Sequence, residues 1–283
     1  MNIVVLMKQV PGTSTVGVDP KSGTLRREGV PAKTNPYDLH ALEAALALKE
    51  RLGGTVTVLS MGPPQAEAVI REAYSMGADR GILLTDRAFA GADTLATAFT
   101  LSQALKTMEF DLIIAGMQST DGDTAQVGPG VAEFLDIPHV SYVKEIHGSS
   151  GLHACYGSVS GEETGLPVGG DGSAKIKVTA DLGDVLVTQE VSLPALITVT
   201  KDTNQPRLPS FRLRKAVSDR PVEIMRAGDM PASSETYYGL AGSATRVERI
   251  FPPERTVVRE IWEGEPRELA ARLAAVLREV AVR

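Results

Sequence analysis

Asp111-Leu-Ile-Ile-Ala115 runs directly into Gly116-Met-Gln-Ser-Thr-Asp-Gly-Asp-Thr-Ala-Gln-Val-Gly-Pro129. The apolar run has the length of a buried strand, and the polar, glycine-containing run after it predicts a turn leading into a helix at 124–135. A helix start leaves backbone N–H groups unpaired and carries partial positive charge, so phosphate binds there in parallel α/β folds. The two runs therefore predict a nucleotide-binding loop at the end of a buried strand.

A second segment of the same kind comes earlier in the chain. Asp86-Arg-Ala-Phe-Ala-Gly-Ala-Asp-Thr-Leu-Ala-Thr97 follows the preceding predicted strand, and its Gly91-Ala-Asp-Thr94 repeats the arrangement of the first loop. We expect the two loops to lie on neighbouring strands and to hold two ends of one cofactor.

Residues 1–147 alternate between strand and helix patterns. Apolar runs predict strands at 3–7, 55–59, 81–84, 111–115 and 140–146, and helical spacing predicts helices at 37–52, 63–76, 93–108 and 124–135. Asn35 and Pro36 supply an N-cap and a first-turn proline to the first helix, which Gly53 and Gly54 end. This alternation predicts an α/β fold with a parallel sheet and helices on both faces.

The pattern changes after residue 147. Residues 152–159 and 175–191 alternate polar and apolar side chains as antiparallel or edge strands do, and residues 157–172 predict a mobile, glycine-rich surface loop. Residues 195–200 form a last strand-like run, and 201–262 is too long for a connection inside a compact domain. We expect a nucleotide-binding domain at 1–200 and, at 201–283, an arm lying on a partner and closed by an amphipathic helix at 266–282.

Composition excludes several classes of protein. The chain has 283 residues, 43% hydrophobic and 23% charged, with a formal net charge of −6, which is ordinary for a globular protein and gives no sign of nucleic-acid binding. No run approaches the roughly 18 apolar residues of a membrane span, and the N-terminus resembles a strand more than a signal peptide. The single cysteine, Cys155, excludes an internal disulfide and fits a reducing, cytoplasmic location.

Simpler explanations of the first loop stay open. Asp121 and Asp123 flank Gly122 and also suit an Asx turn with helix capping. Acid–base chemistry or Mg²⁺ binding by this pair lacks support, because there is no Walker lysine and no further carboxylate at ligand spacing. The segment after the first strand has no GxGxxG fingerprint, which disfavours a Rossmann NAD domain. We expect no catalytic side chain and no metal.

Several motifs, taken in order, resemble the β subunit of electron transfer flavoproteins. They are Val5-Leu-Met-Lys-Gln-Val-Pro11, Asn35-Pro-Tyr-Asp38, Met61-Gly-Pro-Pro64, Met76-Gly-Ala-Asp79 and the run from Gly116 to Pro129. The resemblance covers nearly the whole chain and is strongest over residues 1–145. It implies an adenine-nucleotide-binding (α-hydrolase-like) sandwich with a C-terminal extended arm and helix, which wrap a homologous α subunit that carries FAD.

The resemblance also implies a second nucleotide, bound by the β subunit itself: AMP in ordinary members and FAD in electron-bifurcating ones. The second loop adds its own residues to this set, and all of them are expected along one edge of the sheet. The expected cofactor contacts are Leu6, Asn35, Pro36, Tyr37, Asp38, Met61, Gly91, Asp93, Thr94, Thr97, Gly116, Gln118, Asp121, Asp123, Thr124, Gln126, Val127 and Gly128.

The patterns at 86–97, 121–129 and 242–252 look most like the bifurcating and nitrogen-fixation-type branches. That resemblance implies that the β-site FAD accepts a hydride from NADH and splits the electrons between the α-subunit FAD and ferredoxin or flavodoxin. Three positions depart from the family pattern: Gly12 where Asp is common, Ala98 where Ser is common, and Met117 where Lys or Arg usually precedes Gln. Met117 offers no charged donor to phosphate or flavin.

Family members use a loop after the last strand to recognise a partner dehydrogenase, of the acyl-CoA type or linked to quinone. Thr203-Asn-Gln-Pro-Arg-Leu-Pro209 occupies that position, with Arg207 and Leu208 as the expected partner contacts and a plain surface connection as the alternative. Two other functions stay open: a non-bifurcating carrier with structural AMP, and a stand-alone adenine-nucleotide-binding module. An ATP-consuming ligase or pyrophosphatase of this fold is disfavoured, because the Ser-Gly-Gly-x-Asp-Ser loop is absent.

Overall fold

The computed structural model describes residues 1–12, 31–147, 174–232, 234–248 and 260–281. The chain divides into two compact units, Met1–Glu248 and Arg249–Arg283. The compact unit that holds the sheet therefore extends past residue 200, where the sequence suggested the end of the nucleotide-binding domain. The expected strand at 152–159 and the expected loop at 157–172 lie outside the described residues.

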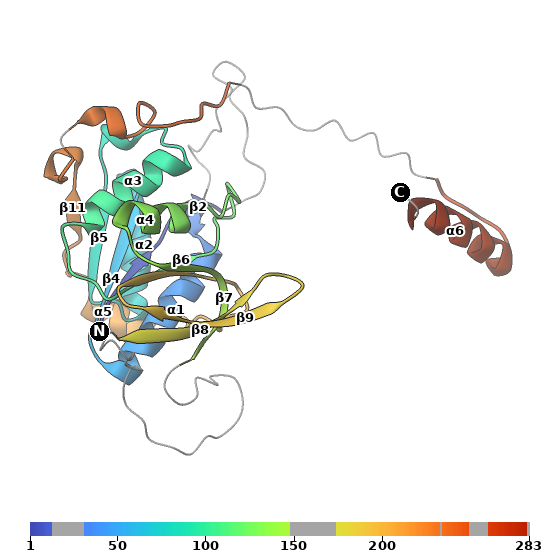
Figure 1. The fold of residues 1–283 in the computed structure, drawn as a ribbon, viewed down its shortest axis with the longest axis horizontal. Coiled ribbons are helices and arrows are strands. Elements are labelled where there is room, and N and C mark those ends of the chain that lie inside the picture. Colours follow the sequence, from blue (N-terminus) through green and yellow to red (C-terminus); the bar gives the residue numbers. More distant parts are fainter. Residues whose placement is uncertain (13–30, 148–173, 233, 249–259, 282–283) are drawn as a thin grey trace. The chain divides into compact units, whose positions relative to one another are not determined.

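The first unit is built on a nine-stranded sheet in the order β11-β5-β4-β1-β6-β10-β7-β8-β9 (Figure 1). Every neighbouring pair from β11 to β7 is parallel, and β7, β8 and β9 pair antiparallel. The strands are β1 (Asn2–Leu6), β4 (Thr55–Met61), β5 (Arg80–Leu84), β6 (Leu112–Gly116), β7 (His139–His147), β8 (Lys175–Asp181), β9 (Leu186–Ser192), β10 (Ala195–Val199) and β11 (Glu223–Met225). A separate short ribbon joins β2 (Gln9–Pro11) to β3 (Ala32–Thr34).

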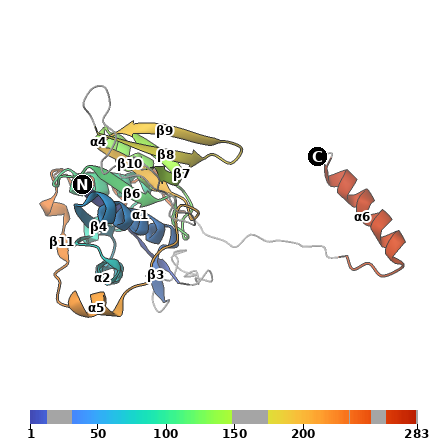
Figure 2. The same cartoon turned by 90° about the horizontal axis from the view of Figure 1, so that it is seen from below.

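Helices cover both faces of this sheet (Figures 1 and 2). Helices α1 (Pro36–Leu52) and α2 (Glu67–Met76) pack against one face with alternate residues of β1, β4 and β6. Helices α3 (Thr94–Leu105) and α4 (Val127–Leu135) pack against the other face and against each other. The predicted α/β fold with a mostly parallel sheet is confirmed, because buried strands alternating with helices bury both faces.

Two elements in the second half of the unit differ from the simple strand order of the chain. β10 comes late in the sequence but lies between β6 and β7, fully buried, with Leu196 packed in the cluster that holds α4. β11 was not predicted, because it has only three residues and lies inside the expected arm, yet it adds a parallel edge strand beside β5 (Figure 1). The ion pair between Arg80 and Glu223 fastens this edge, with an Nη2–Oε2 distance of 2.6 Å.

The start of α4 corrects the predicted helix at 124–135. The helix begins at Val127 with Gln126 at the N-cap position. Asp123 and Ala125 have φ angles of 50° and 55°, so the chain passes through left-handed conformations before it can become helical. The loop after β6 is therefore longer than the sequence pattern indicated, and Thr124 belongs to it.

The second unit contains helix α6 (Pro266–Ala281), close to the predicted helix at 266–282. Among the described residues, no helix is long and apolar enough to cross a membrane.

The buried face of α1 offers a direct test of the core. Leu42 is 0% exposed and packs among β-strand side chains, so Leu42→Ala is expected to lower the free energy of unfolding by about 2–5 kcal/mol through lost burial and a residual cavity. Leu182→Ala is the matched control, because Leu182 is 56% exposed and its loss should change stability by less than about 0.5 kcal/mol. Urea unfolding measures both; equal midpoints would contradict this packing.

Candidate functional site

The parallel sheet has its topological switch point between β1 and β6. The chain proceeds from β1 outward through β4 and β5, and then returns to place β6 on the other side of β1. Ligands of doubly wound sheets bind outside the carboxyl ends of the strands at such a point, because the loops there diverge to opposite sides. The segments after β1 and β6 carry most of the predicted site residues.

Asn35 joins three segments at this switch point through its side chain and its backbone N–H. Its Nδ2 donates to Asp38 Oδ1 at 2.8 Å and to the carbonyl of Gln118 at 2.9 Å. Its Oδ1 accepts the N–H of Thr120 at 3.2 Å, and the backbone N–H of Asn35 donates to the carbonyl of Lys8 at 2.9 Å. Asn35 stands at the N-cap position of α1 but makes no side-chain cap bond. The predicted capping role of its side chain is wrong, because the side-chain amide instead holds the loop after β6.

Asp38 lies beneath this loop as a buried carboxylate. Its Oδ2 accepts the N–H of Lys8 at 2.7 Å, so it ties α1 to the end of β1. A Cβ at Gly116 would lie 2.4 Å from Asp38 Oδ1, which explains a glycine where β6 ends. Burial raises the pKa of Asp38 to about 7 against the opposing effect of the hydrogen bonds from Asn35 and Lys8.

Three polar contacts shape the surface of the loop after β6. Lys8 Nζ lies 2.7 Å from Asp121 Oδ1 and 3.3 Å from Ser119 Oγ, and Gln118 Nε2 donates to Asp123 Oδ1 at 3.1 Å. Burial works to raise the pKa of Asp121, but the hydrogen bond and charge of Lys8 outweigh it and hold that pKa below its usual range. Asp121 is therefore a carboxylate whose negative charge a lysine already balances.

In the second loop, each aspartate caps the helical turn that follows it and also binds a residue far along the chain. Asp86 accepts the N–H of Ala88 at 3.0 Å and that of Ala227 at 3.2 Å. Asp93 caps α3 by accepting the N–H of Ala96 at 3.0 Å, as Asp commonly does at this position. Its other oxygen accepts both the N–H and the hydroxyl of Thr245, each at 2.9 Å.

The two loops meet, but not for the predicted reason. They were expected on neighbouring strands, whereas β4 and β1 separate β5 from β6. The loops come together because α3 and α4 lie on the same face and pack side by side, which brings Thr94 Oγ1 within 3.0 Å of Gln126 Oε1. Next to this contact, the amides of Val127 and Gly128 have no acceptor within α4, whereas Pro129 has no N–H and the amide of Gly130 donates to the carbonyl of Gln126 at 3.0 Å.

The other predicted site residues fall into three groups. Leu6, Pro36, Tyr37 and Met61 lie at or just after the carboxyl ends of β1 and β4 or at the start of α1. Gly91 and Thr97 belong to the α3 side, Gly91 with a φ of 74° in the loop and Thr97 in the first turn of the helix. Thr124 precedes the start of α4, whereas Val127 and Gly128 lie in its first turn.

Sequence reasoning missed three residues that contact this region, Lys8, Ser243 and Thr245, whereas Ser119 lies within the predicted nucleotide-binding loop. Lys8 and the Gly242-Ser-Ala-Thr245 pattern were noticed only as family motifs, with no position in space. Among the described residues, no cluster of three or more His, Cys, Asp or Glu side chains is arranged to hold a metal ion.

The predicted partner contacts behave differently from each other. Arg207 is bound within the chain, with Nε 2.8 Å from Glu43 Oε2 and a second ion pair to Glu50, both on α1. Asn204 adds a third attachment by donating to the carbonyl of His40 at 2.9 Å. Leu208 is 88% exposed. The segment therefore holds Arg207 against α1 and presents Leu208 to solvent.

Comparison with known proteins gives a consistent result. A family profile described as "Electron transfer flavoprotein domain" matches residues 22–234. The chain is 44% identical over 274 residues to the electron transfer flavoprotein subunit beta of Thermoanaerobacterium thermosaccharolyticum, covering 96% of each. It is 39% identical to Protein FixA of Azotobacter vinelandii, covering 98% of this chain and 94% of that protein. It is 40% identical to the caffeyl-CoA reductase-Etf complex subunit CarD of Acetobacterium woodii, covering 99% and 98%.

The buried carboxyl group of Asp38 predicts a pH dependence. With a folded pKa of about 7 and an unfolded one of about 3.9, the folded chain keeps a proton that the unfolded chain releases, so stability falls as the pH rises from about 4 to about 7. Asp38→Asn should remove this slope, which reaches about 1.4 kcal/mol per pH unit at most. Urea unfolding across this range measures it. The exposed-site variant Asp202→Asn should keep the wild-type slope, and parallel profiles for wild type and Asp38→Asn would contradict the assignment.

Proposed function

Because the chain belongs to the β-subunit family of electron transfer flavoproteins, we propose that it works in a heterodimer with an α subunit that carries FAD. In this proposal the loops after β1, β5 and β6 bind a second nucleotide at the carboxyl edge of the sheet. The observation that carries the proposal is the contact between Thr94 and Gln126, which joins two loops from strands that are not adjacent into one wall.

The groups at this edge match the parts of an adenine nucleotide. The amides of Val127 and Gly128 at the start of α4 are donors suited to phosphate, because a helix start favours negative charge. Gln118 and the carboxylates of Asp121 and Asp123 are acceptors suited to ribose hydroxyls. Leu6 and Met61 contribute apolar surface beside them at the ends of β1 and β4. These residues fit the group that the family implies.

Lys8 accounts for one departure from the family pattern. Met117 cannot supply the expected positive charge, and its amide is used in a hydrogen bond to the carbonyl of Val199. The ammonium group of Lys8 reaches the same loop from β1 and contacts Asp121 and Ser119. We infer that Lys8 supplies the cation to the phosphate or flavin side of the site.

We favour FAD over AMP as the β-site nucleotide. The relatives include a subunit of a caffeyl-CoA reductase-Etf complex and FixA proteins, and the patterns at 86–97 and 242–252 look most like those of the bifurcating and nitrogen-fixation-type branches. A flavin bound here would supply the capacity to take a hydride from NADH and release two electrons separately, to the α-subunit FAD and to ferredoxin or flavodoxin. The chain's own residues position and shield it, without an acid–base triad.

Two alternatives make different demands on the chain. An ordinary carrier with structural AMP uses the same loops and the same partner subunit. A stand-alone adenine-nucleotide-binding module needs neither the arm nor an exposed docking residue such as Leu208. The single cysteine of the sequence supports a reducing location for each of them, and we propose the cytoplasm.

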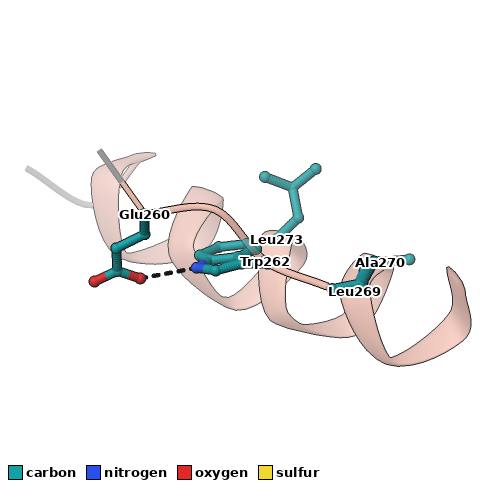
Figure 3. A pocket seen from close by; sticks show the side chains of 5 residues that line it. All are labelled: Glu260, Trp262, Leu269, Ala270 and Leu273. Atoms are coloured by element: carbon teal, nitrogen blue, oxygen red, sulfur yellow. Dashed lines mark hydrogen bonds between the residues drawn. The ribbon is translucent and has the colours of Figure 1, made fainter. Parts of the chain in front are cut away.

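The C-terminal unit carries an amphipathic helix, and its exposed apolar side chains are an argument for a partner subunit. Trp262 donates its indole N–H to Glu260 Oε2 at 2.8 Å (Figure 3), and the guanidinium of Arg272 lies 4.3 Å from the centre of the indole ring. Leu269 and Leu273 line a shallow pocket beside the indole (Figure 3). Ile261, Leu273 and Leu277 remain more than half exposed, so this unit offers an apolar surface, which we propose the α subunit covers.

The nucleotide content of the purified heterodimer tests the proposal. Denaturation should release about two FAD per heterodimer and no AMP, measured by chromatography of the supernatant and quantified against protein. One FAD and one AMP per heterodimer would exclude the bifurcating function and leave the ordinary carrier. A chain that purifies without a homologous flavin-containing partner would overturn the heterodimer itself.

The exposed anchor at 203–209 predicts how a dehydrogenase docks. Leu208→Asp should raise the KM for a partner dehydrogenase of the acyl-CoA type or linked to quinone by about tenfold or more, because a buried apolar anchor carries much of the binding energy of an interface. Steady-state electron transfer with the dehydrogenase as the varied substrate measures it. Leu182→Asp is the matched control, also exposed but on the β8–β9 turn. An unchanged KM for Leu208→Asp would leave this segment a plain surface connection.

A further inference from the structure

Residues 239–245, here called the arm clasp, lie directly on the loop between β5 and α3. The amide of Leu240 donates to the carbonyl of Ala90 at 3.0 Å. Gly239 has a φ of 54°, and a Cβ there would lie 2.2 Å from the carbonyl oxygen of Ala88. The two backbones are therefore in direct contact, and no larger residue at position 239 permits it.

The carboxylate of Asp93 accepts hydrogen bonds from the arm clasp and from its own helix. One oxygen accepts the N–H of Ala96, and the other accepts the N–H and the hydroxyl of Thr245. Three donors occupy a group that offers about four acceptor positions. Burial works to raise the pKa of Asp93, but these hydrogen bonds outweigh it and hold the pKa below its usual range. Little of this carboxylate is left for a nucleotide.

Ser243 closes the contact from the other side. Its hydroxyl accepts the N–H of Asp93 at 2.9 Å and donates to the carbonyl of Gly239 at 2.8 Å. Both the amide and the carboxylate of Asp93 are therefore bound by residues far along the chain. The position of Asp93 depends on the arm as much as on helix α3.

The arm clasp is itself anchored to the core. Tyr238, immediately before it, is 1% exposed and packs edge-on against Phe89 at 5.4 Å between ring centroids. Its hydroxyl donates to the carbonyl of Ala232 at 2.8 Å. Because Phe89 belongs to the same loop as Asp93, this aromatic contact fixes one end of the loop while Thr245 fixes the other.

Thr94 connects this arrangement to the candidate site. It follows Asp93 in the chain, and its hydroxyl donates to Gln126 Oε1 at 3.0 Å, next to the first turn of α4. Thr245, Asp93, Thr94 and Gln126 thus form a continuous path from the arm to the wall of the nucleotide site. A displacement of Asp93 would move Thr94 away from Gln126.

We propose that the arm clasp positions the nucleotide loop, and that Asp93 is a positioning residue held by Ser243 and Thr245 rather than a direct ligand of the nucleotide. This inference rests on the proposed function, since it assigns a role within the same site. It makes nucleotide binding depend on a segment that directly precedes the C-terminal unit.

Substitutions at Thr245 test the proposal in the full heterodimer. Thr245→Val removes the hydroxyl donor to Asp93 and should raise the dissociation constants of FAD and AMP at the β site by about tenfold, since a hydrogen bond to a charged group is lost. Thr245→Ser keeps the hydroxyl and should bind like wild type. Val247→Ala is the matched control, because Val247 is 73% exposed and has no place in the path.

A double-mutant cycle tests whether Asp93 and Thr245 act on nucleotide binding as one unit. If Asp93 acts through the arm clasp, Asp93→Asn combined with Thr245→Val should bind nucleotide no more weakly than Asp93→Asn alone. Additive losses would show that Asp93 and Thr245 act independently, and either that result or wild-type binding by Thr245→Val would overturn the positioning role.

Amide hydrogen exchange keeps this inference distinct from the proposed function. The amides of Asp93 and Leu240 should exchange faster in Thr245→Val than in wild type, whether or not a nucleotide is present, because their acceptors lie on the two sides of the clasp. If the wild-type heterodimer contains no β-site nucleotide, the proposed function is overturned. If these amides nevertheless exchange faster in Thr245→Val than in wild type, the clasp contact is supported. Unchanged exchange would overturn the clasp.

Discussion

The buried side chain of Asn35 sets the geometry on which the site depends. A primary amide offers two donors and one acceptor group in a fixed plane, and here all are used at once: toward Asp38, toward the carbonyl of Gln118 and from the N–H of Thr120. At 1% exposure, an unmatched polar atom would be costly, so the loop after β6 has one place to lie. The order of that loop, and through Asp38 the end of β1, follows from this single group.

Most of the fold follows from local pattern. Buried strand-length runs, helical spacing and glycines such as Gly53 predict the alternation of strands and helices because each depends on a few adjacent residues. Two features depend on distant parts of the chain and are not encoded locally. β11 is three residues long and gains its place only by pairing with β5, and the loops around Thr94 and Gln126 meet through helix packing rather than strand adjacency.

The site divides in the same way. The glycine-containing loops can be located from composition and turn chemistry, and Asp93 can be recognised as a helix cap. The binding partner of each side chain cannot be predicted from the sequence, because the partners are far apart along the chain: Lys8 with Asp121, Arg207 with Glu43, and Thr245 with Asp93. Arg207 is an example. The sequence predicts that it faces a partner, but it is held by carboxylates of α1 in the same chain, and of the two residues only Leu208 is exposed.

The central place of β10 has a consequence for how the protein is made. Its residues are synthesised after β6 and β7, yet they lie between those two strands and complete the surface on which α4 packs. Until Val199 has left the ribosome, β6 and β7 of the nascent chain each have an open edge. Open strand edges are prone to pair with other chains. The candidate site is therefore complete only late in translation, after β10 has left the ribosome.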